Sequence, residues 1–193
     1  MFAHKNLILA SGSPRRQQFL SDLKLNFTIK IKEVEEVYPT HLCAEEITDF
    51  LALLKANAFE NELLEDDILI TSDTIVWLHG KALGKPKDTE DAVKMLQQLA
   101  ANTHEVITSV CLKSTRKTEV FHCKTKVTFS DLSENQIRFY IQNYQPFDKA
   151  GSYGIQDWIG LVGISKIEGS YTNVVGLPTE LFFKKLVDYV EKP

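Results

Sequence analysis

The stretch Leu7-Ile8-Leu9-Ala10-Ser11-Gly12-Ser13-Pro14-Arg15-Arg16 carries the chain from an apolar run into a helix. The run 7–10 is short and apolar, which predicts a buried strand. Pro14 suits the first position of a helix, because its missing N–H would have no partner there. Ser13 stands just before it, where a hydroxyl can cap the N–H groups of the first turn. The stretch therefore predicts a strand that leads directly into a helix.

The two arginines of this stretch break a rule of helix electrostatics. Arg15 and Arg16 place two cations in the first helical turn, where the helix dipole is already positive, at a cost of roughly 0.3–1 kcal/mol each. A bound phosphate would satisfy the backbone N–H groups, the dipole and both guanidinium groups together. The alternative is that both arginines point into water. The residues alone favour an anion site at this helix start.

The composition is that of a globular protein and restricts its class. The chain has 193 residues, of which 44% are hydrophobic, and this length predicts one domain over 1–193. The formal net charge of −4 argues against a large nucleic-acid surface. We find no signal peptide and no apolar run near the roughly 18 residues of a membrane span. The three cysteines are far apart, which indicates reduced thiols and a cytoplasmic location.

The pattern of apolar residues predicts the elements of a mixed fold. Strand patterns occur over 25–31, 67–78, 105–112, 119–129 and 160–167. Helical spacing occurs over 14–22, 44–64 and 179–190, and behind two N-terminal caps, at Asp88 and at Ser133–Gln136. The segment 169–178 has the composition of an ordered loop. Because strands and helices mix without strict alternation, we expect a mixed α/β sheet with helices packed on it.

Asp73 is a lone carboxylate inside the most apolar strand pattern, 67–78. Burying an unpaired carboxylate is expensive, so this side chain requires a cation, a metal or a raised pKa. A structural ion pair is one explanation, and a functional aspartate is the one we favour. Lys55 borders the apolar stripe of the segment 44–64, where a surface lysine is the simpler interpretation. Lys85 stands between Gly84 and Pro86 on a rigid loop, a reasonable position for a phosphate contact.

Carboxylates and cations of these segments together indicate phosphoryl chemistry. Glu36 belongs to an acidic loop, which is either a solvated surface or part of a metal site. Cations for phosphate oxygens and carboxylates for a divalent ion are what positioning, charge neutralisation and water activation require. No Walker A loop is present, so the chain is not a P-loop enzyme. The five histidines show no zinc spacing, and we expect them to be structural or on the surface.

Several motifs in order along the chain resemble one known family. They are LASGSPRR at 9–16, SDT at 72–74, LGKP at 83–86, DKAGSYGIQ at 148–156, EGSY at 168–171 and VGLP at 175–178. They resemble the Maf family of nucleoside triphosphate pyrophosphatases. The resemblance implies a fold shared with the inosine triphosphate pyrophosphatases, elongated and with a cleft between two lobes. It also implies hydrolysis of a nucleoside triphosphate to the monophosphate and pyrophosphate, with Mg²⁺ or Mn²⁺ as the divalent metal.

The same resemblance implies roles for individual residues. Asp73 would accept the proton of the attacking water. Three residues match the positions linked to pyrimidine specificity: Arg15, Thr74 and Gln156. The remaining polar positions of the cleft, some for the phosphates and some for the metal, match Ser11, Arg16, Glu36, Lys55 and Lys85. Ser13 lies at the helix start over which we expect the triphosphate to bind. The metal would be held by Glu36, with Asp73. The segment that ends in Gln156 resembles the branch that acts on dTTP and UTP.

Two departures from the family pattern and two alternative functions stay open. The chain has Glu35-Glu36 where the family commonly has Asp-Glu, and Asp157-Trp158 where it commonly has glycine after Gln156. One alternative is the branch that acts on 7-methyl-GTP. The other is a nucleotide-binding regulator of cell division without useful turnover. Trp158 is a candidate for a contact between two copies of the chain, and a homodimer is one candidate assembly.

Overall fold

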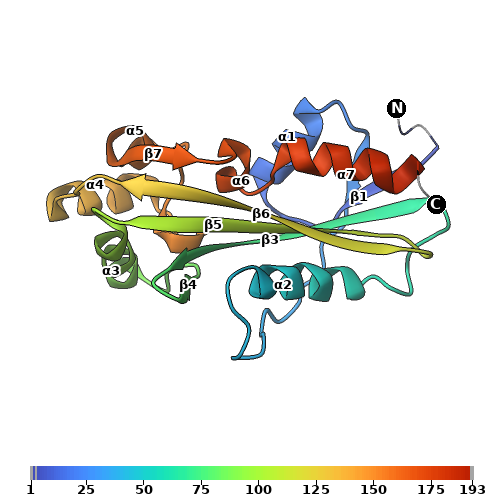
Figure 1. Ribbon diagram of the computed structural model, residues 1–193, viewed down its shortest axis with the longest axis horizontal. Helices are drawn as coiled ribbons and strands as arrows, with labels where there is room; N and C mark the ends of the chain where they lie inside the picture. The colour runs from blue at the N-terminus through green and yellow to red at the C-terminus, as the bar shows by residue number, and fades with distance from the viewer. Residues whose placement is uncertain (1, 3, 192–193) are drawn as a thin grey trace. The chain divides into compact units, whose positions relative to one another are not determined.

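A computed structural model gives the structure of residue 2 and residues 4–191, and its described strands form one sheet (Figure 1). The strand order is β2-β1-β3-β5-β6-β7, with β4 paired to β3. The strands are β1 (Asn6–Leu9), β2 (Phe27–Ile29), β3 (Asp67–Leu78), β4 (Lys81–Leu83), β5 (Thr103–Lys113), β6 (Thr118–Phe129) and β7 (Ile164–Glu168). β1 runs parallel to β2 and β3, whereas β4 pairs antiparallel with β3 and β7 pairs antiparallel with β6. The expected mixed α/β sheet is confirmed.

Helices fill most of the remaining chain. They are α1 (Pro14–Asp22), α2 (Glu45–Asn57), α3 (Thr89–Leu99), α4 (Glu134–Tyr144), the 3₁₀ helix η1 (Ala150–Ser152), α5 (Trp158–Gly163), α6 (Tyr171–Val175) and α7 (Thr179–Glu191). The predicted boundaries of α1 and β3 are confirmed. The capping box at the start of α4 is also present, and the Asp88 carboxylate accepts a hydrogen bond from the Asp91 N–H at 2.8 Å.

Four sequence predictions were wrong in part. The strand predicted over 160–167 begins only at Ile164, because the residues before it form α5. The segment 169–178 contains α6, the strand predicted over 25–31 is reduced to β2, and the helix predicted over 44–64 ends at Asn57. The error at 160–167 has a physical reason, since a short apolar run has no periodicity that separates a strand from a helix.

The residues group into two compact units, and β3, β5 and β6 contain residues of both. Unit 1 consists of Met1–Asp73, Thr108–Cys123 and Gly176–Pro193. Unit 2 consists of Thr74–Ile107 and Lys124–Val175. The expected single domain and the expected cleft between two lobes stay predictions. Among the helices of the described residues, none has both the length and the apolar character that crossing a lipid bilayer demands.

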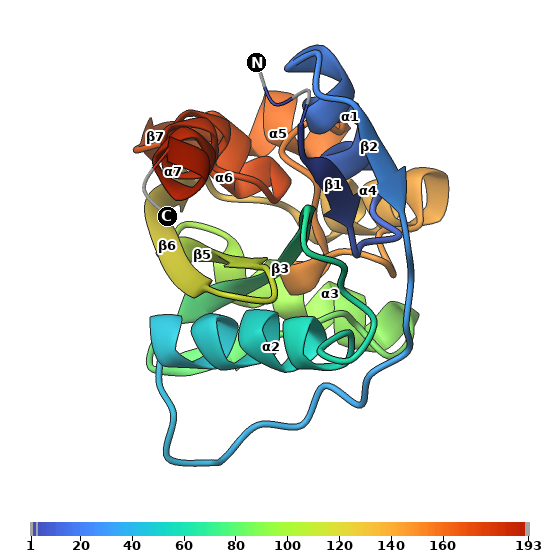
Figure 2. The same cartoon turned by 90° about the vertical axis from the view of Figure 1, so that its right-hand side faces the viewer.

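The core of unit 1 follows from the alternation of side chains along its strands. Successive side chains of a strand point to opposite faces, so Leu7 and Leu9 share one face of β1 while Ile8 belongs to the other. The first face packs with Leu20 of α1 and with α7, and Ile8 packs with α2. Figure 2 shows α2 on one side of these strands and α1 and α7 on the other. This packing holds β1 and α1 in the core. It thereby fixes the positions of Ser11, which follows β1, and of Arg16, which belongs to α1.

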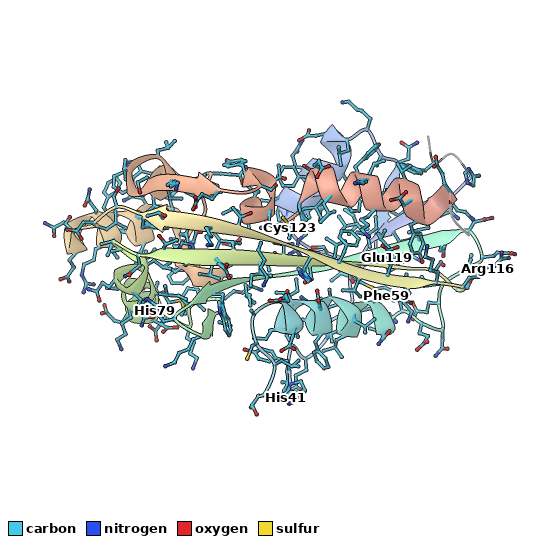
Figure 3. All side chains as sticks on the ribbon, viewed as in Figure 1. His41, Phe59, His79, Arg116, Glu119 and Cys123 are labelled. Carbon is cyan, nitrogen blue, oxygen red and sulfur yellow. The ribbon has the colours of Figure 1, made fainter. Side chains whose placement is uncertain are left out.

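The histidine interpretation is confirmed for the described residues. His4, His41, His79 and His122 are exposed, and Figure 3 shows His41 and His79 on outlying loops of their units. His104 in β5 is buried in unit 2, where its Nε2 lies 2.7 Å from the hydroxyl of Tyr153. The ring of Phe129 packs against both, with centroids 5.7 Å from His104 and 5.1 Å from Tyr153. Burial lowers the pKa of His104 to about 4.

We expect unit 2 to lose stability on acidification through His104. Its pKa is lower in the folded chain than in the unfolded chain, where it is near 6.5, so the unfolded state takes up a proton first as the pH falls. The free energy of unfolding should therefore fall by about 3 kcal/mol between pH 6.5 and pH 4 from this group alone. His104→Gln retains a hydrogen-bonding partner for Tyr153 and does not titrate. Urea titrations at several pH values should show a flatter pH dependence in that variant, and identical slopes would contradict the assignment.

Candidate active site

The start of α1 is built without a side-chain cap. Ser13 occupies the N-cap position and Pro14 the first helical position, as expected. The Ser13 hydroxyl makes no capping hydrogen bond, so that part of the prediction was wrong. Instead, the Ser13 N–H donates to the Ser11 hydroxyl at 3.2 Å, and the Gln17 amide donates to the Ser11 carbonyl at 3.2 Å. Ser11 is buried and fixes the backbone that enters the helix.

Arg16 ties three segments of unit 1 together. Its Nε donates to the carbonyl of Gly176 at 2.9 Å, and its Nη1 donates to the carbonyl of Ser72 in β3 at 3.0 Å. Burial lowers the pKa of Arg16, and the nearby charge of Asp73 opposes that shift. These contacts give Arg16 a structural function that the sequence did not reveal. Its expected contact with phosphate stays a prediction.

A buried ion pair joins α2 to β3 within unit 1. The Asp73 side chain is only 9% exposed, and its Oδ1 accepts a hydrogen bond from the Lys55 ammonium at 2.6 Å. Glu36, from the acidic loop, approaches the same ammonium with its Oε1 at 2.9 Å. Lys55 is therefore no surface lysine, because α2 aims its side chain at β3. A cation accompanies the buried carboxylate, as the cost of burial requires.

The two carboxylates fit one kind of metal site better than another. Glu36 and Asp73 supply hard oxygen donors, which Mg²⁺ and Mn²⁺ prefer. Within residues 2 and 4–191, no three His, Cys, Asp or Glu side chains gather in a way that could hold a metal ion. Mg²⁺ is commonly bound through one or two carboxylates together with phosphate oxygens of the substrate. The donor set fits that arrangement and not an all-protein cage.

The other predicted site residues belong to unit 2. Thr74 follows Asp73 on β3 and is half-buried, whereas Lys85 and Gln156 are exposed on loops. The Gly151 N–H donates to the carbonyl of Gly84 at 2.9 Å, which brings the Lys85 loop beside the segment that carries Gln156. Gly151 has a φ of +66°, and a Cβ there would lie 2.8 Å from Val76.

Gly151 also lies on the same face of β3 as Thr74, because it packs against Val76. Thr74 and Val76 share a face of β3 because they are two residues apart. Segments that are far apart in sequence thus meet on one face of that strand. The glycine is required there by its backbone conformation and by the close approach of Val76.

The site residues are thus assembled in two sets. Those of unit 1 are Ser11, Ser13, Arg15, Arg16, Glu36, Lys55 and Asp73, and those of unit 2 are Thr74, Lys85 and Gln156. Sequence reasoning missed the contributions of Ser72 and Gly176, which act through backbone carbonyls. No residue type could have revealed them, because every residue has a carbonyl.

Comparisons with known proteins show the family to which the chain belongs. The family Maf-like protein matches residues 6–189, and the chain belongs to that family. It is 58% identical over 188 residues to the dTTP/UTP pyrophosphatase of Flavobacterium psychrophilum, covering 97% of this chain and 96% of the relative. It is 60% identical over 184 residues to the dTTP/UTP pyrophosphatase of Flavobacterium johnsoniae, covering 95% of each. Among solved structures, the Staphylococcus aureus Ham1 protein matches 66% of this chain and 73% of its own, with 18% identity and a TM-score of 0.48.

We expect Arg16→Lys to destabilise the folded chain. A lysine retains the charge but cannot donate to the carbonyls of Ser72 and Gly176 together, and hydrogen bonds from charged donors contribute roughly 1.5–3 kcal/mol. The free energy of unfolding in urea, followed by tryptophan fluorescence, should fall by about that amount. Arg138→Lys is the matched control, since Arg138 is exposed and pairs with surface carboxylates. An Arg16→Lys variant as stable as the control would contradict the anchoring function.

Proposed function

We propose that this chain is a pyrophosphatase that hydrolyses dTTP and UTP to the monophosphate and pyrophosphate. The observation that carries the proposal is the buried carboxylate of Asp73, fixed by Lys55 at 2.6 Å. A positioned carboxylate is what a general base for water requires. Support for the pyrimidine substrates comes from relatives named dTTP/UTP pyrophosphatase that share 58% and 60% of their residues with this chain.

Asp73 acts on the attacking water in the proposed reaction. The water oxygen bonds to the α-phosphorus while its proton passes to the Asp73 carboxylate. The bond from the α-phosphorus to the oxygen that bridges to the β-phosphate breaks, and pyrophosphate leaves with that oxygen. Lys55 holds the carboxylate in place for this step. A divalent metal, Mg²⁺ or Mn²⁺, held by Glu36 and Asp73, would supply charge neutralisation for the phosphates when bound.

The remaining residues bind the substrate in this proposal. Phosphate oxygens contact backbone N–H groups at the start of α1, near Ser11 and Ser13, since a helix start favours anions. Arg16 and Lys85 add positive charge. The pyrimidine is recognised by Arg15, Thr74 and Gln156. Hydrogen bonds to the base can select strongly, because a wrong base leaves buried polar groups without partners.

We further propose a cytoplasmic location. Cys43 and Cys111 are thiols, and burial raises the pKa of Cys111 to about 11, which keeps it protonated. Persistent thiols are typical of a reducing compartment. A homodimer stays the candidate assembly, and sedimentation velocity would test it.

A nucleotide panel tests the function directly. With Mg²⁺ or Mn²⁺, pyrophosphate release should be fastest from dTTP and UTP, and chelation of the metal should abolish it. A preference for 7-methyl-GTP would place the chain in the other branch of the family. Tight dTTP binding without pyrophosphate release would instead favour the regulator without turnover. Product analysis should find the monophosphate and pyrophosphate, since a diphosphate and phosphate would contradict attack at the α-phosphorus.

Asp73→Asn should nearly abolish turnover and leave the fold intact. The amide keeps the size of the carboxylate but cannot accept the proton, and loss of a general base costs roughly 10²–10⁴-fold in rate. The kcat for dTTP and the circular dichroism spectrum are the measurements. Asp66→Asn, the same chemical change at an exposed position seven residues earlier, should keep the full kcat. Equal rates in the two variants would remove Asp73 from the mechanism.

A further inference from the structure

Gln156 stands in a four-residue turn that spans Gly154 to Asp157. The Asp157 N–H donates to the Gly154 carbonyl at 3.0 Å, which closes the turn. Ile155, the second residue, is buried, and Gln156, the third, is exposed. The conformation of this turn therefore sets the direction of the Cα–Cβ bond of Gln156, from which the amide extends.

One phenol hydroxyl braces both ends of that turn. Tyr140 of α4 has no exposed surface, and its hydroxyl accepts a hydrogen bond from the Gly154 N–H at 3.0 Å. The same hydroxyl donates to Oδ2 of Asp157 at 2.6 Å. Both contacts go to the turn. Gly154 and Asp157, which lie on either side of Gln156 in the sequence, are thus both bonded to the Tyr140 hydroxyl oxygen.

The carboxylate of Asp157 is committed to this brace. Asp157 occupies the N-cap position of α5, where an aspartate commonly bonds to the N–H groups of the helix, yet its side chain makes no capping bond. It faces Tyr140 instead, with the Lys149 ammonium 3.9 Å from the same oxygen. An N-cap aspartate that gives up its capping bond indicates that the contact with Tyr140 is the favoured one.

Two glycines make room for the braced turn. A Cβ on Gly154 would lie 2.5 Å from Oδ2 of Asp157, and a Cβ on Gly160 would lie 1.9 Å from the carbonyl oxygen of Ile155. On the other side, the Tyr153 hydroxyl is fixed by His104. The segment that carries Gln156 is thus bonded to His104 before the turn and to Tyr140 at the turn, and these contacts restrict its backbone.

We propose that Tyr140 and Asp157 are positioning residues that set the base selectivity of this chain. Through the turn, they hold Gln156 in the orientation that reads a pyrimidine. This inference rests on the proposed function, in which Gln156 contacts the base. Neither residue touches the substrate in this scheme. Their effect is on the discrimination between bases, because a glutamine on a loosened turn samples several orientations and rejects a wrong base less well.

The test removes, one at a time, the groups that form the brace. Tyr140→Phe deletes only the hydroxyl, and Asp157→Ala deletes the acceptor. Asp157→Asn retains an oxygen that can accept the hydroxyl proton. The matched control is Tyr144→Phe, since the Tyr144 ring stacks on Tyr140 with centroids 5.2 Å apart but lies at the exposed end of α4. For each variant, kcat and KM are measured for dTTP, UTP and GTP with Mg²⁺, together with the melting temperature.

We expect the ratio of kcat/KM for dTTP to that for GTP to fall about tenfold in Tyr140→Phe and in Asp157→Ala, in line with the loss of one charge-assisted hydrogen bond. The loss should appear mainly in KM. The double variant should be no less selective than either single variant, because both changes break the same brace. Asp157→Asn should retain a selectivity within about twofold of that of the original chain. Tyr144→Phe should not alter the selectivity.

The outcomes separate this inference from the proposed function. A lower melting temperature with unchanged selectivity in Tyr140→Phe would make the brace purely structural and overturn the inference. Equal losses in Tyr140→Phe and Tyr144→Phe would do the same. If the unaltered chain itself shows no preference for dTTP and UTP, the proposed function fails first and the inference fails with it. A selective unaltered chain with selective variants leaves the function standing and refutes the brace alone.

Discussion

A carboxylate buried on a strand of a sheet is costly unless a cation, a metal or a raised pKa accompanies it, and three segments of unit 1 meet at such a carboxylate. Asp73 obtains its cation from Lys55, which α2 directs at β3. Glu36 shares that cation and so fixes part of an otherwise irregular acidic loop. Removal of the lysine would leave the buried carboxylate of Asp73 without its cation. Through Lys55, the ion pair therefore connects α2, the acidic loop and β3 at Asp73.

The start of α1 follows a related logic with different chemistry. Arg16 enters the positive end of a helix, and its donors are taken up by the backbone carbonyls of Ser72 and Gly176. Hydrogen bonds to these carbonyls help to offset the cost of a cation at that place. Arg15, one residue earlier, lies elsewhere around the helix because successive residues are about 100° apart. The two arginines thus face different sides of the start of α1, although the sequence presents them as a pair.

Local signals were readable from the sequence, and contacts across long separations were not. α1 and β3 were predicted with their boundaries because Pro14 and an uninterrupted apolar run are local features. The partner of Asp73 is 18 residues away, and spacing alone favoured a surface lysine at that position. The helix expected behind the cap at Ser133–Gln136 is α4, and Tyr140 lies in its buried stripe. Periodicity shows that such a ring is buried, but it does not show where the hydroxyl goes. Both missed contacts depend on how distant segments pack.

In the proposed scheme, the hydrogen bonds of Tyr140 on either side of Gln156 link a contact across a long sequence separation to base selectivity. A glutamine side chain has several rotatable bonds, and a mobile backbone would add to the range of positions that its amide samples. The turn alone supplies one hydrogen bond, from the Asp157 N–H to the Gly154 carbonyl. The Tyr140 hydroxyl adds one at each end of the turn, from a helix whose capping box and buried stripe fix it independently. The rigidity of the exposed residue is thus drawn from the core of unit 2. On this proposal, a chain that retains every residue in contact with the base still loses selectivity when the Tyr140 hydroxyl is removed.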